Sequence, residues 1–236
     1  MNDIFNTDVS LKTETPAFAK HVLPAVPSSE VYLEDCVKAL KRYADNHFDL
    51  AIVDPPYGID ASMGVGLHSR RKFQKAGKQW DNQTPTAEYW QELMRVSKNQ
   101  IVCGANYFME HLYSTKSFVC WIKNNPAPNF AEAEYLWTSF DINGKVYDSK
   151  KQIQHQIMWE GGSMHPTQKP IALYDWLLNR FAKEGDKILD THLGSGSSRI
   201  AAYKGGFNFV GFEIDQEYYE KQEKRFKDFK SQLRLF

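Results

Sequence analysis

Cysteine is scarce in this chain of 236 residues, and the three that occur lie far apart, at Cys36, Cys103 and Cys120. An odd, scattered set without a Cys-x-x-Cys pair indicates neither a disulfide framework nor a zinc site, so we expect no bound metal. Charge of one sign is also lacking, because 29 Lys and Arg residues balance 29 Asp and Glu residues. No bulk field therefore draws the protein to a polyanion, and any binding of nucleic acid must come from a local basic patch.

Long apolar runs are absent as well. The chain has no stretch of about 18 apolar residues, and residues 1–15 lack the apolar segment of a signal peptide. We therefore predict a cytoplasmic protein that does not contact a membrane. What the chain does contain, 42% hydrophobic and 25% charged residues, is close to the globular average. This composition excludes wholesale disorder, collagen-like repeats and coiled coils.

The length fits one domain with insertions. Residues 1–29 include Pro16, Pro24 and Pro27 and show no sustained period, so we predict an irregular N-terminal arm there. Residues 30–236 are predicted to form a single domain. Two candidate insertions lie at about 59–85 and 140–164.

Apolar strands alternate with amphipathic helices from residue 31 onward. The pattern predicts strands at 31–33, 50–53, 100–103, 118–122, 187–189 and 207–214, and helices at 36–43, 87–96, 171–181, 198–203 and 217–230. Residues 140–162 show no clear period and predict only loops or short strands. This alternation indicates an α/β fold with a mostly parallel central sheet and helices on both faces.

A glycine-rich turn, Gly194-Ser195-Gly196, follows the strand at 187–189. An ordinary tight turn would explain the glycines alone, but Asp190 before them and Glu213 at the end of the next strand favour a site for a nucleoside cofactor. Glycine lets the backbone approach a ligand, and an acidic side chain can accept hydrogen bonds from a ribose diol. Arg199 stands where the third glycine of the dinucleotide fingerprint should fall, which favours an adenosyl group without phosphates.

A second motif, Asp54-Pro55-Pro56-Tyr57, comes directly after an apolar strand. Consecutive prolines are stiff and cannot donate backbone hydrogen bonds, so the Pro55 carbonyl is a fixed acceptor beside the Asp54 carboxylate. Two acceptors that face one amino group on a heterocycle would stabilise the positive charge that develops during its alkylation. Tyr57 would stack on the base. The alternative, a proline-rich turn that merely ends the strand, is less favoured at this position.

The two motifs, in this order, resemble the amino-group DNA methyltransferases that use S-adenosylmethionine, in their circularly permuted β group. His165-Pro166-Thr167-Gln168-Lys169-Pro170 resembles the family's segment near the methionine end of the cofactor, and Glu34-Asp35-Cys36 resembles its acidic turn beside the adenine. The matches span about residues 31–225. The resemblance implies a Rossmann-like class I methyltransferase fold, circularly permuted, with S-adenosylmethionine as cofactor and no metal.

The resemblance also assigns site residues. It places catalysis on Asp54, Pro55, Pro56 and Tyr57, and cofactor binding on Asp35, Cys36, Asp54, His165, Pro166, Thr167, Lys169, Asp190, His192, Leu193, Gly194, Ser195, Gly196 and Glu213. His192 departs from the family, which commonly has an aromatic residue there, and this puts in doubt how the sulfonium end of the cofactor packs. As a metal ligand His192 has no partner at a suitable spacing.

A basic segment follows the proline motif. Residues 61–80 contain no acidic residue and carry five basic ones, Arg70, Arg71, Lys72, Lys75 and Lys78. A solvated surface loop would explain them, but their place favours contact with DNA phosphates beside a base that is flipped out of the helix. Candidates for reading base edges are weaker, namely Asn124, Asn125, Asn129 and residues 141–156, within or near the insertion at 140–164. Dimerisation is common in the enzymes that the chain resembles, so a homodimer is one possible state of this protein.

The resulting hypothesis is methyl transfer from S-adenosylmethionine to the N6 amino group of adenine in DNA, in a prokaryotic cell or a phage-infected host. Two alternatives stay open: methylation of the cytosine amino group, and a catalytically silent nucleic-acid-binding module of the same fold. Family members with Ser in place of Asp54 more often take cytosine, so Asp54 favours adenine. The intact motifs at 54–57 and 194–196 argue against a silent module.

Overall fold

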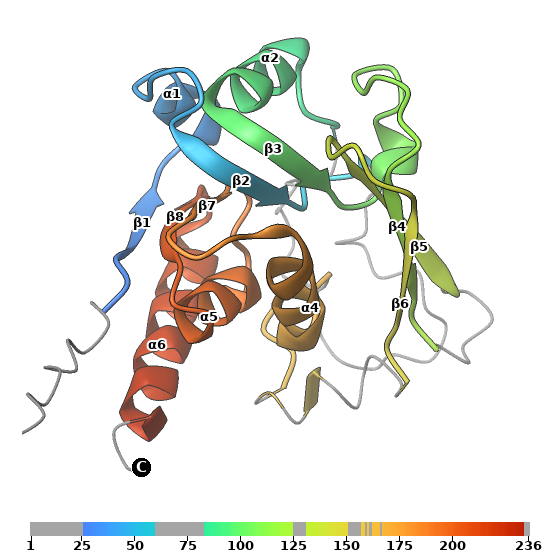
Figure 1. The fold of residues 1–236 in the computed structure, drawn as a ribbon. Helices are drawn as coiled ribbons and strands as arrows, with labels where there is room; N and C mark the ends of the chain where they lie inside the picture. The colour runs from blue at the N-terminus through green and yellow to red at the C-terminus, as the bar shows by residue number, and fades with distance from the viewer. Residues whose placement is uncertain are drawn as a thin grey trace, which may run out of the picture.

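The computed structural model describes residues 26–59, 83–124, 131–150, 157–158, 160, 162–165 and 167–233. Within them the chain forms an eight-stranded sheet with helices on both faces (Figure 1). The strands are β1 (Ser29–Leu33), β2 (Phe48–Val53), β3 (Ser97–Val102), β4 (Phe118–Ile122), β5 (Ala133–Thr138), β6 (Lys145–Asp148), β7 (Lys187–Asp190) and β8 (Asn208–Glu213). The helices are α1 (Cys36–Leu40), α2 (Ala87–Val96), the short 3₁₀ helix η2 (Ala105–Tyr107), α4 (Ile171–Phe181), α5 (Ser197–Lys204) and α6 (Gln216–Leu233). Among these helices none combines the length and apolar character that crossing a membrane requires.

Most neighbouring strands run parallel. The strand order is β1-β8-β7-β2-β3-β5-β4-β6, in which β1, β8, β7, β2 and β3 form a parallel block. β5 runs antiparallel to both β3 and β4, and β6 pairs parallel with β4 at the far edge. The predicted α/β class with a mostly parallel sheet is confirmed. Because the strands of the block end at one edge, the residues that follow them meet there.

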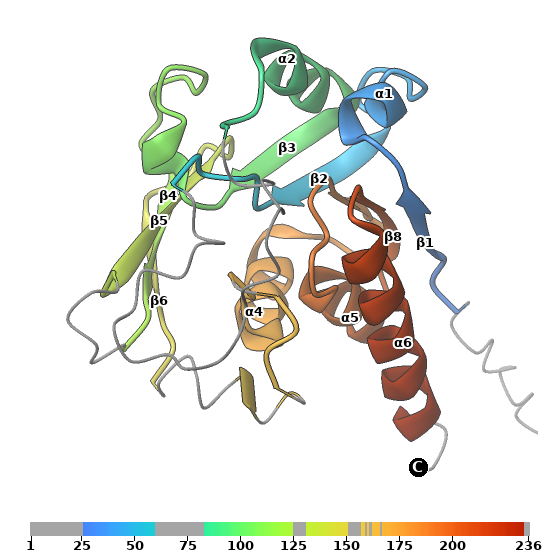
Figure 2. The same cartoon turned by 180° about the vertical axis from the view of Figure 1, so that it is seen from behind.

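The sequence of β2 shows how two cores form around one sheet. Leu50 and Ile52 pack in a cluster with α4 and α5, whereas Ala51 and Val53 pack in a second cluster with α1 and α2. Figure 2 shows α1 and α2 on one side of the sheet and α4, α5 and α6 on the other. A strand that is buried on both faces must be apolar throughout, which explains the continuous apolar run in β2.

The helix α2 is stabilised both by a capping residue at its start and by an apolar face that packs against the sheet. The Thr86 side chain accepts a hydrogen bond from the backbone N–H of Tyr89 at 3.4 Å, which caps the first turn. Tyr89, Leu93 and Val96 then recur at helical spacing and are at most 1% exposed. The predicted bounds of this helix and of α4 are confirmed.

Several segments differ from the prediction. The helix predicted at 36–43 ends at Leu40, where the bonds from Arg42 N to Ala39 O and from Tyr43 N to Leu40 O tighten the last turn. β1 already begins at Ser29, inside the range predicted as an irregular arm. β5 was not predicted. β6, in contrast, is a short strand of the kind predicted for 140–162, and it joins the sheet, so part of the candidate insertion is an edge strand.

The first and last strands of the described residues are neighbours. β1 pairs with β8 over its whole length, from Ser29 opposite Phe209 to Leu33 opposite Glu213. β1 is therefore an edge strand and is held in the sheet by residues almost two hundred positions away in sequence. This arrangement suits a permuted chain, although the permutation itself remains a prediction.

Candidate active site

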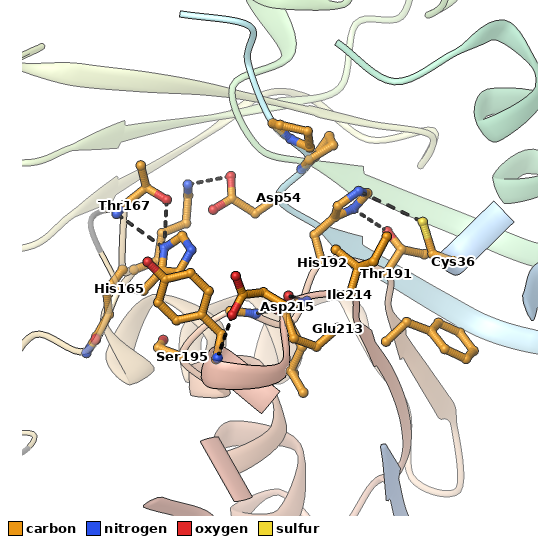
Figure 3. Close-up of a pocket in the computed structure, with 18 of the residues that line it drawn as sticks. Cys36, Asp54, His165, Thr167, Thr191, His192, Ser195, Glu213, Ile214 and Asp215 are labelled. Atoms are coloured by element: carbon orange, nitrogen blue, oxygen red, sulfur yellow. Dashed lines mark hydrogen bonds and ion pairs between the residues drawn. The ribbon is translucent and has the colours of Figure 1, made fainter. Parts of the chain in front are cut away.

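A cavity of about 320 Å³ opens at the carboxyl edge of the parallel block, a size typical of small-molecule sites (Figure 3). Its walls are Glu34, Asp35, Cys36, Asp54, Pro55, Pro56, Tyr57, His165, Thr167, Gln168, Lys169, Tyr174, Thr191, His192, Leu193, Gly194, Ser195, Ser197, Phe212, Glu213, Ile214, Asp215 and Tyr218. The structure thus brings together all four residues predicted to be catalytic and most of those predicted to hold the cofactor. Of the remainder, Asp190 and Gly196 do not line the cavity, and Pro166 lies outside the described residues.

One end of the cavity, which we call the glycine-turn end, is built by Asp190, His192, the turn 194–196 and Glu213. Gly194 and Gly196 have φ of +51° and +74°, a region that favours glycine. A Cβ at Gly196 would lie only 3.1 Å from the Cβ of Gln222, so a side chain there would also crowd α6.

Glu213 faces the turn from the end of β8. Its Oε2 accepts a hydrogen bond from Gly194 N at 2.8 Å, and its Oε1 accepts one from Asp215 N at 2.9 Å. Burial raises the pKa of this carboxyl above its ordinary value, and the backbone donors offset only part of the shift. The carboxylate is held in place by amides and still lines the cavity, where it can accept hydrogen bonds from a ligand.

Asp190 lies behind the turn rather than in the cavity wall. It is 1% exposed, and it accepts hydrogen bonds from His192 N at 3.0 Å and from the Ser198 hydroxyl. Burial raises the pKa of Asp190 to about 7, although both bonds oppose the shift. Its geometry fixes the backbone that enters the turn and the start of α5.

His192 forms part of the cavity wall as a neutral ring. Its Nδ1 lies 2.9 Å from Thr191 Oγ1, and its Nε2 lies 3.9 Å from Cys36 Sγ (Figure 3). Its ring also meets the Tyr89 ring edge to face, with centroids 5.3 Å apart. Burial lowers the pKa of His192 to about 4 and raises the pKa of the Cys36 thiol to about 12. At neutral pH the ring therefore carries no charge and presents aromatic surface.

The other end, which we call the tetrapeptide end, is built by Asp54 to Tyr57 after β2. Asp54 Oδ1 lies 2.6 Å from Lys169 Nζ and accepts a hydrogen bond from the Tyr57 hydroxyl at 2.7 Å. Within the part of the chain that the structure describes, no polar group bonds to Oδ2 of Asp54. The side chain is 15% exposed, and the residue lines the cavity. One carboxylate oxygen is thus anchored and the other is available to a ligand.

Lys169, which was predicted to bind the cofactor, also contacts the tetrapeptide end. It lines the cavity, but its side chain is only 4% exposed and its ammonium contacts Asp54, Tyr57 and Glu134. The attraction of the two carboxylates keeps the pKa of Lys169 well above its ordinary value in spite of burial. This side chain is a permanent cation beside the proline motif.

Glu134 and Lys123 were missed by sequence reasoning. Glu134, in β5, has Oε1 at 3.1 Å from both Lys169 Nζ and the Tyr57 hydroxyl, and Oε2 at 2.6 Å from Lys123 Nζ. Although burial favours its protonated form, the attraction of Lys169 and Lys123 lowers the pKa of Glu134 to about 2. No motif marked it, because β5 itself was not predicted and its partners lie on other elements.

The donor atoms of Asp54, Cys103 and Glu134 lie within 4.8 Å of one another, close enough to share a cation. In this structure Lys169 Nζ already bonds two of these three groups, at 2.6 Å and 3.1 Å. The negative charge of the cluster is therefore met by an ammonium ion of the chain itself.

The Tyr57 ring is held between neighbours. It stacks on Tyr107 of η2 with centroids 4.8 Å apart and planes 12° from parallel. Gly104 packs against the same ring: its φ is +61°, and a Cβ at that position would overlap the Tyr57 ring atoms. Tyr107, which is 43% exposed, was not predicted as a site residue.

The residues predicted to contact DNA lie outside the described residues, since Arg70, Arg71, Lys72, Lys75 and Lys78 all fall in 60–82. So do Asn125, Asn129 and residues 151–156, which were candidates for reading base edges. Asn124 is described, and its side chain donates to Asp148 Oδ1 at 2.6 Å, which ties the end of β4 to the end of β6.

Proteins similar to this chain in sequence and in fold carry the names of DNA methylases and methyltransferases. The model of the DNA methylase family matches residues 113–224. The chain is 27% identical over 242 aligned positions to the Type II methyltransferase M.HinfI of Haemophilus influenzae, covering 83% of this chain and 67% of that protein. It is 23% identical to the Type II methyltransferase M2.MboI of Moraxella bovis, covering 84% and 87%. The crystal structure of the M1.HpyAVI–SAM complex superposes with a TM-score of 0.55 at 19% identity, covering 84% of this chain and 98% of that one.

Proposed function

We propose that the chain is an S-adenosylmethionine-dependent DNA methyltransferase of the amino-group type, and that it methylates the N6 amino group of adenine. The observation that carries the proposal is the Asp54 carboxylate at the cavity, with Oδ1 anchored by Lys169 and Tyr57 and Oδ2 without a partner among the described residues. Beside it, Pro55 lines the same cavity and offers a backbone carbonyl. An amino group has two N–H bonds, and these two acceptors match them.

The glycine-turn end fits S-adenosylmethionine. Gly194 lines the cavity without a side chain, and Glu213 can accept hydrogen bonds from the ribose hydroxyls. The neutral ring of His192 can pack near a sulfonium without repelling it. Glu34-Asp35-Cys36 would border the adenine, and His165 with Thr167 would border the methionine end. When bound, S-adenosylmethionine supplies a methyl group on a positively charged sulfur.

The tetrapeptide end would prepare the amino group for attack. Its nitrogen lone pair is delocalised into the base, which makes it a weak nucleophile. Acceptors at Asp54 Oδ2 and at the Pro55 carbonyl would hold both N–H bonds and favour a pyramidal nitrogen, and they would stabilise the positive charge that grows as the carbon–nitrogen bond forms. The Asp54 carboxylate also lies where the surplus proton of the methylated nitrogen would leave. Tyr57 would support the base by stacking.

Asp54 is also the basis for choosing adenine. In the family that the motifs resemble, members with Ser at this position more often take cytosine, so a carboxylate favours N6 of adenine. Methylation of the cytosine amino group remains the runner-up, because the same two acceptors serve either base. A catalytically silent module would need the reactive groups to be idle despite their assembly around one cavity.

The DNA itself would meet the basic residues predicted in 60–82. We propose that Arg70, Arg71, Lys72, Lys75 and Lys78 contact phosphates beside a flipped base, since the segment directly follows the tetrapeptide. Neutralising Arg70, Arg71 and Lys72 together should weaken DNA binding and flatten its salt dependence while sparing cofactor affinity. Unchanged affinity at low salt would contradict this role. The cytoplasmic location and the homodimer remain predictions.

The experiment that tests the proposed function is transfer of labelled methyl groups from S-adenosylmethionine to unmethylated DNA, followed by nucleoside analysis. Wild type should yield N6-methyladenine, and Asp54→Ala should yield none while still binding the cofactor. Asp49→Ala is the matched control, because Asp49 lies on β2, the strand that Asp54 follows, and pairs with Lys98 away from the cavity. Methylcytosine would move the assignment to the runner-up, and no product with intact cofactor binding would favour the silent module.

A further inference from the structure

The tetrapeptide end holds a chain of four charged side chains that come from four different parts of the fold. Lys123 follows β4, Glu134 lies in β5, Lys169 precedes α4, and Asp54 follows β2. They are linked in that order by ion pairs of 2.6 Å, 3.1 Å and 2.6 Å. Two ammonium ions thus alternate with two carboxylates, and the last carboxylate is the one proposed to bind the substrate amino group.

Such a chain is costly to bury, because each charge loses its hydration. Lys123 is 19% exposed, Glu134 9% and Lys169 4%. Two neutral acceptors, such as backbone carbonyls, could bind the two N–H bonds of the substrate amino group without any of these four charged side chains. The cost suggests that the charges do something for Asp54 that apolar packing would not do.

Removal of Lys169 would leave two carboxylates facing each other in a buried site. Burial and the charge of Glu134 both favour the protonated form of Asp54 and raise its pKa, and Lys169 is the main group that opposes them. A protonated Asp54 would be a donor on one oxygen and a poor acceptor on the other, so it would lose its proposed role. Lys169 also binds Oδ1, which leaves Oδ2 toward the cavity.

Glu134 controls where the ammonium of Lys169 sits. It shares Lys169 Nζ with Asp54 and also accepts from the Tyr57 hydroxyl, so one carboxylate orients both the cation and the ring. Lys123 compensates the charge of Glu134 from the other side. Without Glu134, the full charge of Lys169 would act on Asp54 and withdraw electron density from the acceptor.

We infer that Lys169 and Glu134 are positioning residues, which keep Asp54 ionised with one oxygen anchored and the other presented to the substrate amino group. This inference rests on the proposed role of Asp54. Among the described residues, the other titratable groups that face Asp54 are Tyr57, Cys103 after β3, Asp190 at the end of β7, Tyr89 on α2 and Tyr174 on α4. Burial raises the pKa of Tyr89 and Tyr174 well above their ordinary values, so both are neutral at pH 7. Tyr57 and Cys103 are neutral at pH 7, because burial raises the pKa of both well above their ordinary values.

The test is the pH dependence of the single-turnover rate of methyl transfer, with saturating S-adenosylmethionine and DNA. Lys169→Met should move the acid limb of the profile up by about 1 to 3 pH units, because an adjacent cation lowers a carboxyl pKa by that amount. Glu134→Gln should move it down by about 1 unit, because a like charge is removed. At pH 7 the rate should fall about 10-fold or more in Lys169→Met, and much of it should return at higher pH.

A charge-balanced double variant separates electrostatics from packing. Glu134→Gln/Lys169→Met removes one charge of each sign, so its acid limb should lie between those of the single variants, and it should be faster at pH 7 than Lys169→Met. Lys169→Arg, which keeps the charge, should restore most of the wild-type profile. The matched control is Glu223→Gln, which removes the carboxylate from an ion pair with Arg199 outside the cavity and should shift nothing.

Shifts of the two single variants in the same direction, or slower rates without any shift, would overturn the inference. If Lys169→Met does not fold, the downward shift of Glu134→Gln against Glu223→Gln decides. A measurement that does not depend on turnover separates this inference from the proposed function. It is the pH titration of the carboxyl ¹³C resonance of Asp54, with cofactor bound and no DNA present. The resonance is identified by its absence in Asp54→Asn. A pKa of Asp54 that rises in Lys169→Met and falls in Glu134→Gln would support the positioning role even if no DNA were methylated.

Discussion

The two ends of the cavity hold buried carboxylates by different means. At the glycine-turn end, Asp190 and Glu213 accept hydrogen bonds from backbone amides and a hydroxyl, and no Lys or Arg of the described residues pairs with either. At the tetrapeptide end, Asp54 and Glu134 are paired with two lysines. Buried carboxylates therefore have no cationic partner among the described residues at the glycine-turn end, whereas lysines balance their charge at the tetrapeptide end.

This difference suits the charges of the two proposed ligands. Carboxylates without a cation have raised pKa values, as Asp190 and Glu213 do, and they become easier to ionise when a cationic ligand arrives. A sulfonium cofactor is such a ligand. The amino group of a base is neutral, so it requires an oriented acceptor and no net charge, which the paired end provides. The comparison predicts that changes at the tetrapeptide end alter rate, whereas changes at the glycine-turn end alter cofactor affinity.

Among the variants that test this comparison of the two ends, the largest effect is expected from Gly104→Ala at the tetrapeptide end. The new Cβ would overlap the Tyr57 ring and displace it from Asp54 and Tyr107. We expect kcat to fall about 100-fold, since small misplacements of a positioned group cost that much, while the Kd for S-adenosylmethionine stays within about threefold. Steady-state kinetics and a direct binding measurement would check both values.

Gly185→Ala is the control for that variant. Gly185 also has a positive φ, +87°, but nothing lies within 4 Å of a Cβ there. It should lose about 1 to 2 kcal/mol of stability from backbone strain, with kcat unchanged. Equal loss of kcat in the two variants would mean that strain rather than the Tyr57 contact is responsible, and the division between the two ends would lose support.

An intermediate effect is expected from Glu213→Gln at the glycine-turn end. The amide keeps the size of the side chain but loses the charge that two backbone donors and the proposed ribose contact share. Hydrogen bonds to charged groups contribute about 1.5 to 3 kcal/mol, so the Kd for S-adenosylmethionine should rise about 10-fold or more. At saturating cofactor kcat should change little. A fall in kcat with an unaltered Kd would reverse the assignment of the two ends.

The smallest effect is expected from His192→Phe. The ring is neutral at pH 7, so a phenyl ring should replace it with cofactor affinity changed by less than about threefold. The variant should instead alter the pH dependence of stability. Because folding lowers the pKa of His192 from 6.5 to about 4, the unfolded chain binds more protons between these values, and stability falls as pH falls through that window.

Thermal unfolding of wild type and His192→Phe between pH 4 and 7 checks this sign. The variant should lose less stability on acidification than wild type does. Asp190 has the opposite sign, because folding raises its pKa from 3.8 to about 7, and its contribution is lost as pH rises through that range. The difference between wild type and the variant isolates the histidine, since Asp190 is present in both. Parallel curves would show that His192 is not held neutral by the fold.

The sequence predicted the elements whose local pattern and tertiary role agree. α2 and α4 were placed correctly, because each carries buried residues at helical spacing, and β2 was recognisable from its continuous apolar run. β5 was missed because Ala133-Glu134-Tyr135 is neither apolar throughout nor a clear alternation. Its place in the sheet is decided by antiparallel pairing with β4, where Ile122 lies opposite Ala133, and with the more distant β3. The residues of β5 alone contain neither partner.

The same reasoning explains which site residues were found. Motifs in one stretch of chain, such as Asp54 to Tyr57 and Gly194 to Gly196, are visible in sequence and meet at the cavity. Glu134 and Tyr107 stand in no motif, and their importance comes only from contacts with Lys169 and Tyr57. Lys169 was found as a member of a motif, but the direction of its ammonium depends on two strands that the motif does not include.

The pairing of β1 with β8 has a consequence for the order in which the molecule can be built. In the sheet, β8 and β7 lie between β1 and β2, yet both are synthesised after every other strand. During synthesis, β1 and β2 therefore lack β7 and β8, the strands that connect them in the sheet, until the ribosome has reached Glu213. Contacts between such distant segments slow folding and leave strand edges exposed meanwhile. We thus expect the glycine-turn end to assemble late, after the α2 and β3 region has already formed its local contacts.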